Sequence, residues 1–523
     1  MEGKHHMKRM IAATLTLALT TAALAGCAAN AAAPTDDQNT VAAATMSNET
    51  GKTPKYVFLF IGDGMSYPQI QSTSDYLGAL NDEDYWQAQP SLDDNQGAIL
   101  DGPEYLNFMN FEGVGTAVTF DSNSFAPDSA STATSIATGH KTYSGSINVD
   151  ETGTVEYETI AEQLKAQKGY EIGVITSVNL NHATPAAFYA HQASRSSYYE
   201  IGLEMVESDF DYFAGGGLLD PTGSEGDQTD LYQLAQEAGY TVARTYAEAD
   251  AISADTDKAI IIEENLADSD AIPYEIDRTD DMWSLADYVE KGIEVLDNDT
   301  GFFMMCEGGK IDWACHANDA GSSIHDTQAL ADAVQVAIDF AAEHPDETLI
   351  LVTGDHETGG LTIGFAGTDY DTYLSLLESQ TISFTQFDEL YVAEYKANGT
   401  SFEEVLADIE ELFGLKTEGE EGDKLVLTEY EIETLRAAYE KSVNGTATSS
   451  YEQEEYVLYG TYEPLSVTIT HIINNKSGVS FTSYSHTGLP VAVFADGVGA
   501  DEFNGYYDNT DIFNKLADML GVE

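Results

Sequence analysis

Acidic and imidazole side chains follow apolar segments at several places in this chain of 523 residues. Asp355 and His356 close the apolar run 349–354, and Asp63 closes the run 56–62. Asp312 and His316 are four residues apart, which places both on one face of a helical turn. Carboxylate oxygens and imidazole nitrogens are the common protein ligands of Zn²⁺. The pattern therefore predicts a metal-dependent site built from several segments.

A serine and a further histidine extend this set. Ser129 begins a predicted helix of small residues, and the free N–H groups at a helix N-terminus favour an anion. His486 stands shortly before the last predicted strand. Taken singly, such residues could be strand-end caps or structural histidines, and Ser129 beside Asp128 could be an ordinary helix cap. Their occurrence as a set favours a metal site with a nucleophilic serine.

Alternating strand and helix patterns indicate the fold that brings these residues together. Expected strands cover 56–61, 171–176, 302–306, 349–354 and 491–494, and expected helices cover 159–168, 282–296 and 326–343. The alternation is typical of a parallel sheet. We expect an α/β three-layer sandwich with a mostly parallel central sheet and helices on both faces. In such folds ligands bind at the carboxyl ends of the strands, where the acidic residues stand.

One region departs from this alternation. Residues 366–465 contain two predicted helices, 401–413 and 428–441, many acidic residues and no strand–helix repeat. We interpret them as an inserted acidic cap on the α/β core. The predicted organisation is a signal peptide (1–27), a flexible tether (28–52), a first core segment (53–365), the insertion (366–465) and a last core segment (466–523).

The N-terminus has the features of an export signal. Lys8 and Arg9 precede the apolar stretch 10–25, which ends in a Leu-Ala-Gly-Cys sequence at Cys27. This ending resembles a lipobox, which implies that Cys27 is lipidated and anchors an exported protein to the cell envelope. An ordinary signal peptide with a chance cysteine is the alternative. Cys306 and Cys315 flank motif residues that need separate positions, so we expect no disulfide between them.

The charge balance excludes some partners. The chain has 21 Lys and Arg against 90 Asp and Glu, a formal net charge of −69. Such a field repels nucleic acids, so no nucleic-acid binding is expected. If the substrate is an anion, a locally positive site is needed, and bound metal ions would supply it.

As a set, the motifs resemble those of bacterial alkaline phosphatases. They are I-G-D-G-M at 61–65, D-S-A at 128–130, A-T-P at 183–185 with an arginine at 195, E-G-G-K-I-D at 307–312, T-G-D-H-E-T-G-G at 353–360 and H-T-G at 486–488. They occur in the family's order, and the match spans residues 55–365 and 466–510. Any one motif alone would be weak.

The resemblance implies two Zn²⁺ ions and one Mg²⁺ ion. The implied ligands of the first zinc are Asp312, His316 and His486. Those of the second zinc are Asp63, Asp355 and His356, with Ser129 within reach. Those of the third site are Asp63, Thr184 and Glu307. Nitrogen and carboxylate ligands suit Zn²⁺, and an all-oxygen set suits Mg²⁺. The resemblance also makes Ser129 the nucleophile and Arg195 the side chain that binds two phosphate oxygens.

Two positions depart from the best-known bacterial member. That enzyme has an aspartate where this chain has His182, and a lysine where it has Trp313. We expect His182 to hold a water or a ligand of the third site, which leaves the identity of the third metal open. Trp313 cannot make a charged contact to phosphate, so we expect weaker product binding.

The resemblance implies hydrolysis of small phosphate monoesters to an alcohol and inorganic phosphate through a phosphoserine intermediate. Related phosphodiesterases and phosphonate hydrolases are the alternatives, although Thr184, Glu307 and Arg195 favour monoesters. A lipid-anchored phosphate-binding protein is a further alternative, but it would not need six metal ligands around a serine. Family members are commonly homodimers, so a homodimer remains open, as does the role of the insertion.

Overall fold

The structure is a computed structural model that describes residues 53–81, 100–445 and 453–523. The predicted signal peptide, the lipidation site at Cys27 and the tether lie outside the described residues. Within the described part, no helix has the length and apolar character needed to cross a membrane. Cys306 and Cys315 are both buried and free, as the sequence predicted.

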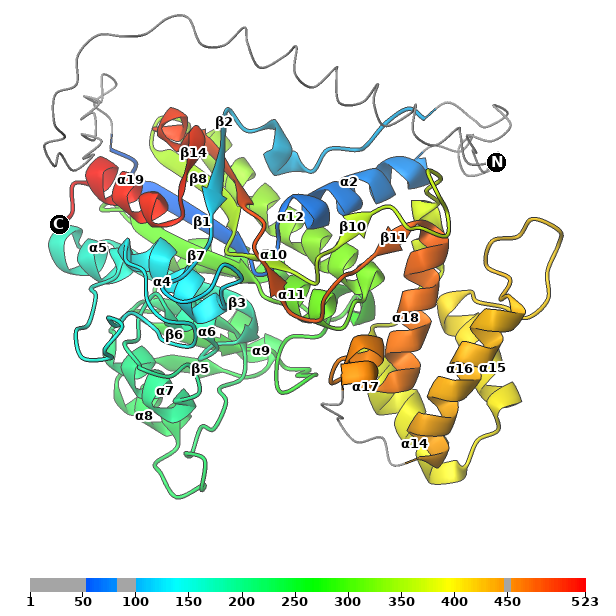
Figure 1. Ribbon diagram of the computed structural model, residues 1–523. Coiled ribbons are helices and arrows are strands. Elements are labelled where there is room, and N and C mark those ends of the chain that lie inside the picture. Colours follow the sequence, from blue (N-terminus) through cyan, green and yellow to red (C-terminus); the bar gives the residue numbers. More distant parts are fainter. Residues whose placement is uncertain (1–52, 82–99, 446–452) are drawn as a thin grey trace, which may run out of the picture. The chain divides into compact units, whose positions relative to one another are not determined.

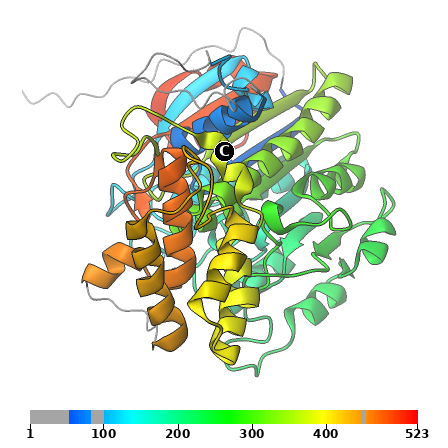
Figure 2. The same ribbon diagram turned by 90° about the vertical axis from the view of Figure 1, so that its right-hand side faces the viewer.

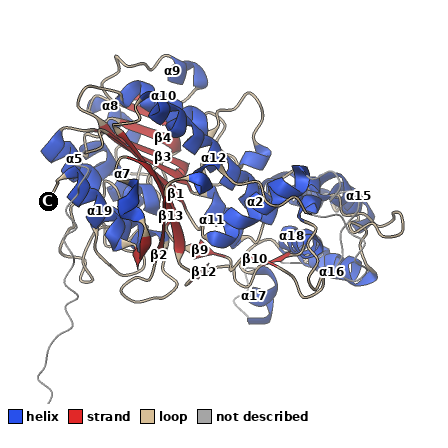
Figure 3. Ribbon diagram, turned by 90° about the horizontal axis from the view of Figure 1, so that it is seen from above, coloured by secondary structure: helices blue, strands red, loops and turns tan. Residues whose placement is uncertain are grey.

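A ten-stranded sheet forms the centre of the fold (Figures 1 and 3). In the order in which they lie side by side, its strands are β14 (Gly505–Asp508), β2 (Gly113–Val118), β13 (Val491–Gly497), β8 (Thr348–Gly354), β1 (Tyr56–Gly62), β7 (Phe302–Gly308), β3 (Glu171–Asn179), β4 (Tyr212–Gly216), β6 (Ala259–Ile262) and β5 (Thr241–Ala243). Among these described strands only β13 runs antiparallel to its neighbours. The expected mostly parallel sheet is confirmed.

Both faces of the sheet are buried, and the central strand β1 accordingly carries apolar side chains on both of its faces. In β1, Val57, Leu59 and Ile61 pack into one core, whereas Phe58 and Phe60 pack into the core on the other face. The first core is closed by α4 (Ser129–Thr138), α5 (Ile160–Lys168), α7 (Tyr198–Glu207), α8 (Leu231–Glu237) and α19 (Thr510–Leu520). The second is closed by α10 (Leu285–Leu296) and α12 (Ala320–Glu343). This is the predicted three-layer sandwich.

Shorter elements complete the core and its edges. They are α2 (Tyr67–Asn81), η1 (Asn107–Asn110), α6 (Ala183–Ala186), α9 (Tyr246–Asp250), η2 (Glu275–Asp277), α11 (Lys310–His316), β9 (Glu357–Thr358), β10 (Thr362–Ile363), β11 (Val479–Ser480), β12 (His486–Thr487) and η6 (Ala500–Phe503). β9 pairs with β12, and β10 pairs with β11. The β9–β12 pair joins the segment after β8 to a distant part of the chain.

Residues 366–465 are here called the helical insertion. They are followed by the rest of α18, and both lie between β10 and β11 in the sequence. Their elements and α18 are η3 (Leu374–Ser379), α13 (Phe384–Phe387), η4 (Asp388–Val392), α14 (Ala393–Asn398), α15 (Phe402–Phe413), α16 (Glu429–Tyr439), η5 (Glu440–Asn444), α17 (Gln453–Tyr459) and α18 (Pro464–Ser477). Figure 2 shows these helices as a group in front of the sheet. They share an apolar core that includes Phe387, Val405, Phe413 and Leu435. The helices predicted at 401–413 and 428–441 begin one residue after capping boxes at Ser401 and Thr428.

Candidate active site

The site lies at the carboxyl ends of the four central strands. β1 pairs in register with β7 on one side and β8 on the other, so that Ile61 stands beside Glu307 and Thr353. The residues after these strands therefore converge. Asp63 follows β1 and is fully buried. Gly64 has φ of +72°, and a Cβ there would lie 2.9 Å from the Cα of Asp312, so the turn requires glycine.

One buried cluster consists of Asp63, Asp355 and His356. The Nε2 atom of His356 lies 3.3 Å from Asp63 Oδ1 and 3.3 Å from Asp355 Oδ2. Asp355 accepts hydrogen bonds from the Gly64 N–H (3.1 Å) and the Thr132 hydroxyl (2.9 Å). Burial, together with the neighbouring carboxylates, raises the pKa of Asp63 well above its usual value and the pKa of Asp355 to about 7. Two buried carboxylates that lie this close together repel each other when both are ionised, and a cation between them would offset that repulsion.

A second cluster consists of Asp312, His316 and His486. β9 and β12 bring His486 to it, because His486 pairs with Thr358 two residues after His356. Asp312 Oδ2 lies 3.3 Å from His316 Nε2, and Asp312 Oδ1 lies 3.5 Å from His486 Nε2. Burial would raise the pKa of Asp312, but the charge and hydrogen bond of His316 hold it well below its usual value.

The two imidazoles of this cluster are oriented as metal ligands. His316 Nδ1 donates to the Tyr484 carbonyl oxygen at 2.6 Å, and His486 Nδ1 donates to the Pro127 carbonyl oxygen at 2.5 Å. In the neutral rings, both Nε2 atoms then carry lone pairs, and these atoms are only 3.0 Å apart. Two lone pairs at that distance repel unless a cation or a proton lies beside them, so the donor set fits Zn²⁺.

His356 lies between the two clusters. Its ring stacks on that of His486 with the ring centres 3.7 Å apart. The ligand atoms of Asp312, His356 and His486 also lie within 4.8 Å of one another, as do those of Asp63, Asp355 and His356. His356 therefore connects the two ligand sets that the resemblance implies.

Ser129 is the first residue of α4, and its hydroxyl faces the buried cluster. Ser129 Oγ lies 3.2 Å from His356 Nε2 and 3.5 Å from Asp63 Oδ1. Asp128 is the helix N-cap, whose carboxylate accepts from the Ser131 N–H, so Ser129 itself is free of the capping role. The helix cap is therefore Asp128 and not Ser129.

The residues of the third implied site lie on the far side of Asp63. Thr184 Oγ1 is 3.3 Å from Asp63 Oδ2, and Glu307 accepts a short hydrogen bond from Thr176. All four side chains are buried. The Oε1 atom of Glu307 has no hydrogen-bond partner among the described residues. A buried, unpartnered carboxylate oxygen is a ready ligand for a cation.

Arg195 lies between Asp128 and His182. Its Nη1 donates to Asp128 Oδ2 at 2.9 Å, and its Nη2 donates to His182 Nε2 at 3.3 Å. Burial and the Arg195 charge lower the pKa of His182 to about 3, so His182 is neutral and accepts this bond. Its buried Nδ1 has no partner among the described residues. His182 therefore orients the guanidinium and keeps one nitrogen for a water or another ligand.

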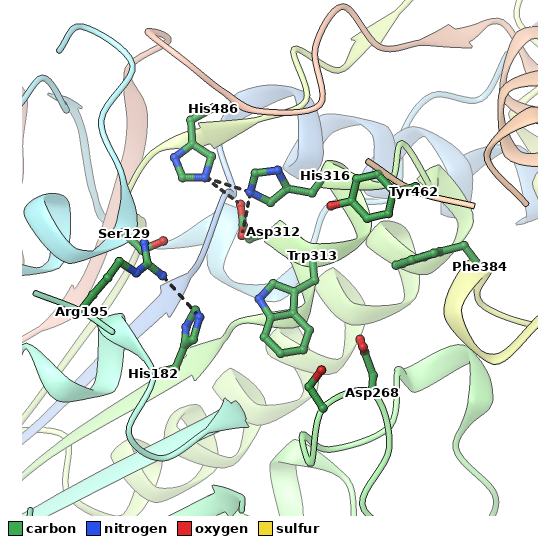
Figure 4. Close-up of a pocket in the computed structure, with 11 residues that line it drawn as sticks. Ser129, His182, Arg195, Asp268, Asp312, Trp313, His316, Phe384, Tyr462 and His486 are labelled. Carbon is green, nitrogen blue, oxygen red and sulfur yellow. Dashed lines mark hydrogen bonds and ion pairs between the residues drawn. The ribbon is translucent and has the colours of Figure 1, made fainter. Parts of the chain in front are cut away.

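These residues open into a cavity of about 390 Å³ (Figure 4). Its lining consists of Ser129, His182, Arg195, Asp268, Ser269, Asp312, Trp313, His316, Phe384, Tyr462 and His486. Every predicted site residue within the described part lies in this lining or in the clusters beneath it. Sequence reasoning missed Asp268, Phe384 and Tyr462, because none of them belongs to a motif. It also missed Asp128 as the partner of Arg195, although its place beside Ser129 was a signal.

Comparison with known proteins adds an independent finding. The sequence model of the alkaline phosphatase family matches residues 54–522. Alkaline phosphatase 3 of Bacillus subtilis is 31% identical over 89% of this chain and 89% of its own length. The crystal structure of a cold-active alkaline phosphatase from Shewanella sp. is 29% identical, with a TM-score of 0.69 over 89% of this chain and 99% of that one.

A third similar protein comes from the Antarctic bacterium TAB5. A variant of its alkaline phosphatase, in which a histidine is replaced by aspartate, was solved with Mg bound in the M3 site. It is 25% identical, with a TM-score of 0.57 over 90% of this chain and 99% of that one.

Proposed function

This chain belongs to the alkaline phosphatase family and hydrolyses phosphate monoesters through a phosphoserine intermediate, and we propose that Ser129 is the serine that forms it. The observation that supports this most is the position of Ser129 Oγ, 3.2 Å from His356 and at the wall of the cavity. The hydroxyl stands where the buried carboxylates and imidazoles of two segments converge. A nucleophile needs such activating neighbours.

The proposed reaction has two transfers. Ser129 Oγ attacks the phosphorus atom in line, the bond to the alcohol oxygen breaks, and the alcohol leaves with a proton. Water then attacks the phosphoserine, releasing inorganic phosphate and restoring the hydroxyl. Arg195, held by Asp128 and His182, donates from its guanidinium to the equatorial phosphoryl oxygens and neutralises part of their charge.

The two clusters have the ligands for the implied zinc ions. Asp312, His316 and His486 would hold one ion, and Asp63, Asp355 and His356 would hold the other. When bound there, Zn²⁺ supplies Lewis acidity, which lowers the pKa of a neighbouring hydroxyl or water and stabilises developing negative charge. The chain's own part is to fix the ligands, through the bonds from His316 and His486 to backbone carbonyls and from Thr132 to Asp355.

The third ion would bind to Asp63, Thr184 and Glu307, a set of oxygens that suits Mg²⁺. Because the neutral His182 accepts from Arg195 through Nε2, its Nδ1 carries the proton and can bond to a water of the third ion, but it cannot coordinate the ion as a carboxylate oxygen would. In the TAB5 relative, the variant with Mg in the M3 site has an aspartate in place of a histidine. We propose that His182 weakens the preference of the third site for Mg²⁺ in this chain.

Outside the described residues, we propose that Cys27 carries the lipid of an exported, envelope-anchored enzyme, with residues 28–52 as its tether. The division into core segments 53–365 and 466–523 around the insertion 366–465 belongs to the same proposal. Cys27→Ser should move the enzyme from the membrane fraction to the soluble fraction. Light scattering of purified residues 28–523 would measure whether it dimerises.

The function is tested with a phosphate monoester and the matching diester as substrates of residues 28–523. Initial rates are measured before and after chelation, and again after Zn²⁺ and Mg²⁺ are restored. We expect monoester hydrolysis that is lost on chelation and regained with metal, and poor hydrolysis of the diester. A preference for the diester would support the related phosphodiesterases instead. Bound metal without turnover of either ester would support a binding protein.

A further inference from the structure

The cavity extends past the catalytic residues to a second wall, part of which comes from the helical insertion. Phe384, the first residue of α13, and Tyr462, two residues before α18, line the cavity with Trp313. Figure 4 shows Phe384 and Tyr462 on the opposite side of the cavity from Ser129 and Arg195, with Trp313 between. We call these three side chains the aromatic wall. A phosphoryl group held at Ser129 would direct its alcohol toward this wall.

The insertion is fastened to residues that neighbour α11, the helix that carries Asp312 and His316. Asp319, fully buried at the N-cap of α12, accepts the Phe384 N–H at 3.0 Å and the Gln380 Nε2 at 2.7 Å. Asp277 accepts the Ser383 N–H at 2.9 Å. Because α12 directly follows α11, which bears Asp312, these bonds set the position of Phe384 relative to the catalytic clusters.

The rings are also fixed against each other. Tyr462 packs edge-on against Phe384, with ring centres 5.7 Å apart and an interplanar angle of 86°. Trp313 packs beneath the ammonium of Lys310, which lies 4.6 Å from the ring centre. Lys310 is fully buried. Side chains held in this way form a surface that keeps its shape in the absence of a ligand.

The charge on this side of the cavity is neutralised. Asp268 lines the cavity, and its carboxylate pairs with the Lys310 ammonium at 2.9 Å. Near the aromatic wall, the described lining thus offers apolar ring surface and an ion pair that is already satisfied. A cationic alcohol group would have to compete with Lys310 for the Asp268 carboxylate, whereas an aromatic group could stack on the rings without displacing Lys310.

We infer that the aromatic wall binds the alcohol part of the substrate and gives the enzyme a preference for phosphate monoesters whose alcohol carries a planar aromatic group. This inference rests on the proposed function of the Ser129 site. The cavity volume of about 390 Å³ leaves room for such a group beside the phosphoryl group. The insertion then has a defined role, which is to shape the specificity of a reaction that the core performs.

The preference is tested with 2-phenylethyl phosphate and propyl phosphate, which release alcohols of the same chemical class. We expect kcat/KM to be roughly tenfold or more higher for the phenylethyl ester, in line with the effect of apolar contacts on discrimination. Phe384→Ala and Tyr462→Ala should each lower this ratio by roughly three- to tenfold. Tyr462→Phe keeps the ring and should keep the ratio.

Tyr430 provides a matched control. It belongs to α16 of the same insertion, is 77% exposed and does not line the cavity, so Tyr430→Ala should leave both rates unchanged. If Phe384→Ala does not fold, Phe384→Leu removes the ring but keeps an apolar side chain and tests the same point.

The outcomes separate the two proposals. A wild-type ratio near one, or ring-removing variants that keep the wild-type ratio, would overturn the aromatic-wall inference and leave the proposed function intact. Failure of the metal-loaded wild type to hydrolyse either ester would overturn the proposed function itself.

Discussion

The carboxyl ends of the central strands and the helical insertion contribute to one cavity in different ways. The strand ends supply buried polar groups, such as Asp63 and His356, whose positions follow from strands paired in register. The insertion supplies two aromatic rings whose positions depend on tertiary bonds, such as that from Phe384 to Asp319. We therefore expect the core to carry the chemistry and the insertion to contribute to the choice of alcohol. Variants in the two regions should differ in kind.

The largest effect should come from the nucleophile. Ser129→Ala removes the oxygen that attacks phosphorus, and we expect kcat to fall by roughly 10⁴- to 10⁶-fold, as for other nucleophilic serines. The measurement is the initial rate with a chromogenic phosphate monoester at saturating metal. Ser135→Ala is the control, because the Ser135 hydroxyl bonds to the Ser131 carbonyl oxygen within α4 and does not line the cavity. A similar loss in the control would point to damage to α4 instead.

Arg195→Ala should have the next largest effect. Loss of a charged donor to the phosphoryl oxygens should lower kcat/KM by roughly 10²- to 10³-fold. Arg244→Ala, at a residue that packs on the Tyr232 ring outside the cavity, is the control. An Arg195→Ala enzyme with nearly normal kcat/KM would mean that Arg195 serves only as the ion-pair partner of Asp128.

Trp313→Lys tests the balance between the two regions, because Trp313 belongs to the core but is part of the aromatic wall. A new ammonium near the phosphoryl group should tighten inhibition by inorganic phosphate about tenfold, the usual size of one charge-assisted contact. Trp313→Phe should not change it. The inhibition constant of phosphate, measured with one monoester, checks this, and an unchanged constant in Trp313→Lys would refute the effect on product binding.

His182→Asp sharpens the account of the third site. A carboxylate would make the surroundings of Asp63, Thr184 and Glu307 entirely oxygen, so we expect Mg²⁺ to bind severalfold or more tightly. Metal content after equilibration with Mg²⁺ at fixed Zn²⁺ measures this directly. The exposed His140, which stacks on Tyr157, gives the control variant His140→Asp. Equal Mg²⁺ binding in the wild type and His182→Asp would remove His182 from the third site.

The smallest expected effect concerns stability at high pH. His191 lies between Glu162 (3.4 Å) and Glu204 (3.2 Å) and so links α5 to α7 near the segment of Arg195. Burial would lower its pKa, but hydrogen bonds and charge from these two glutamates raise it to about 10. The raised pKa means that the stabilisation is complete below about pH 6.5 and disappears as the pH rises through about 10.

We therefore expect His191→Gln to lower the free energy of unfolding by about 2 kcal/mol at pH 6, and by much less at pH 10.5. Denaturant titrations of both proteins at the two pH values provide the comparison. A difference that does not change with pH would show that the His191 charge contributes nothing.

The two regions also differ in what the sequence reveals. Asp63 and Asp355 could be predicted because apolar strands, β1 and β8, end directly before them. The apolar pattern predicts that α12 starts at 326, because Ala320, Gly321 and the two serines that follow are not part of an apolar repeat. In the structure the cap at Asp319 starts the helix at Ala320. Phe384 and Tyr462 could not be predicted, since their place in the cavity depends on distant partners.

Trapping the covalent intermediate would show whether Ser129 is the residue that carries the phosphoryl group. The metal-loaded enzyme is mixed with inorganic phosphate or a monoester, quenched in acid, digested and analysed by mass spectrometry. We expect one added phosphoryl group on the peptide that contains Ser129, located at that residue and absent from Ser129→Ala. A phosphoryl group on another residue, or turnover by Ser129→Ala at the wild-type rate, would contradict it.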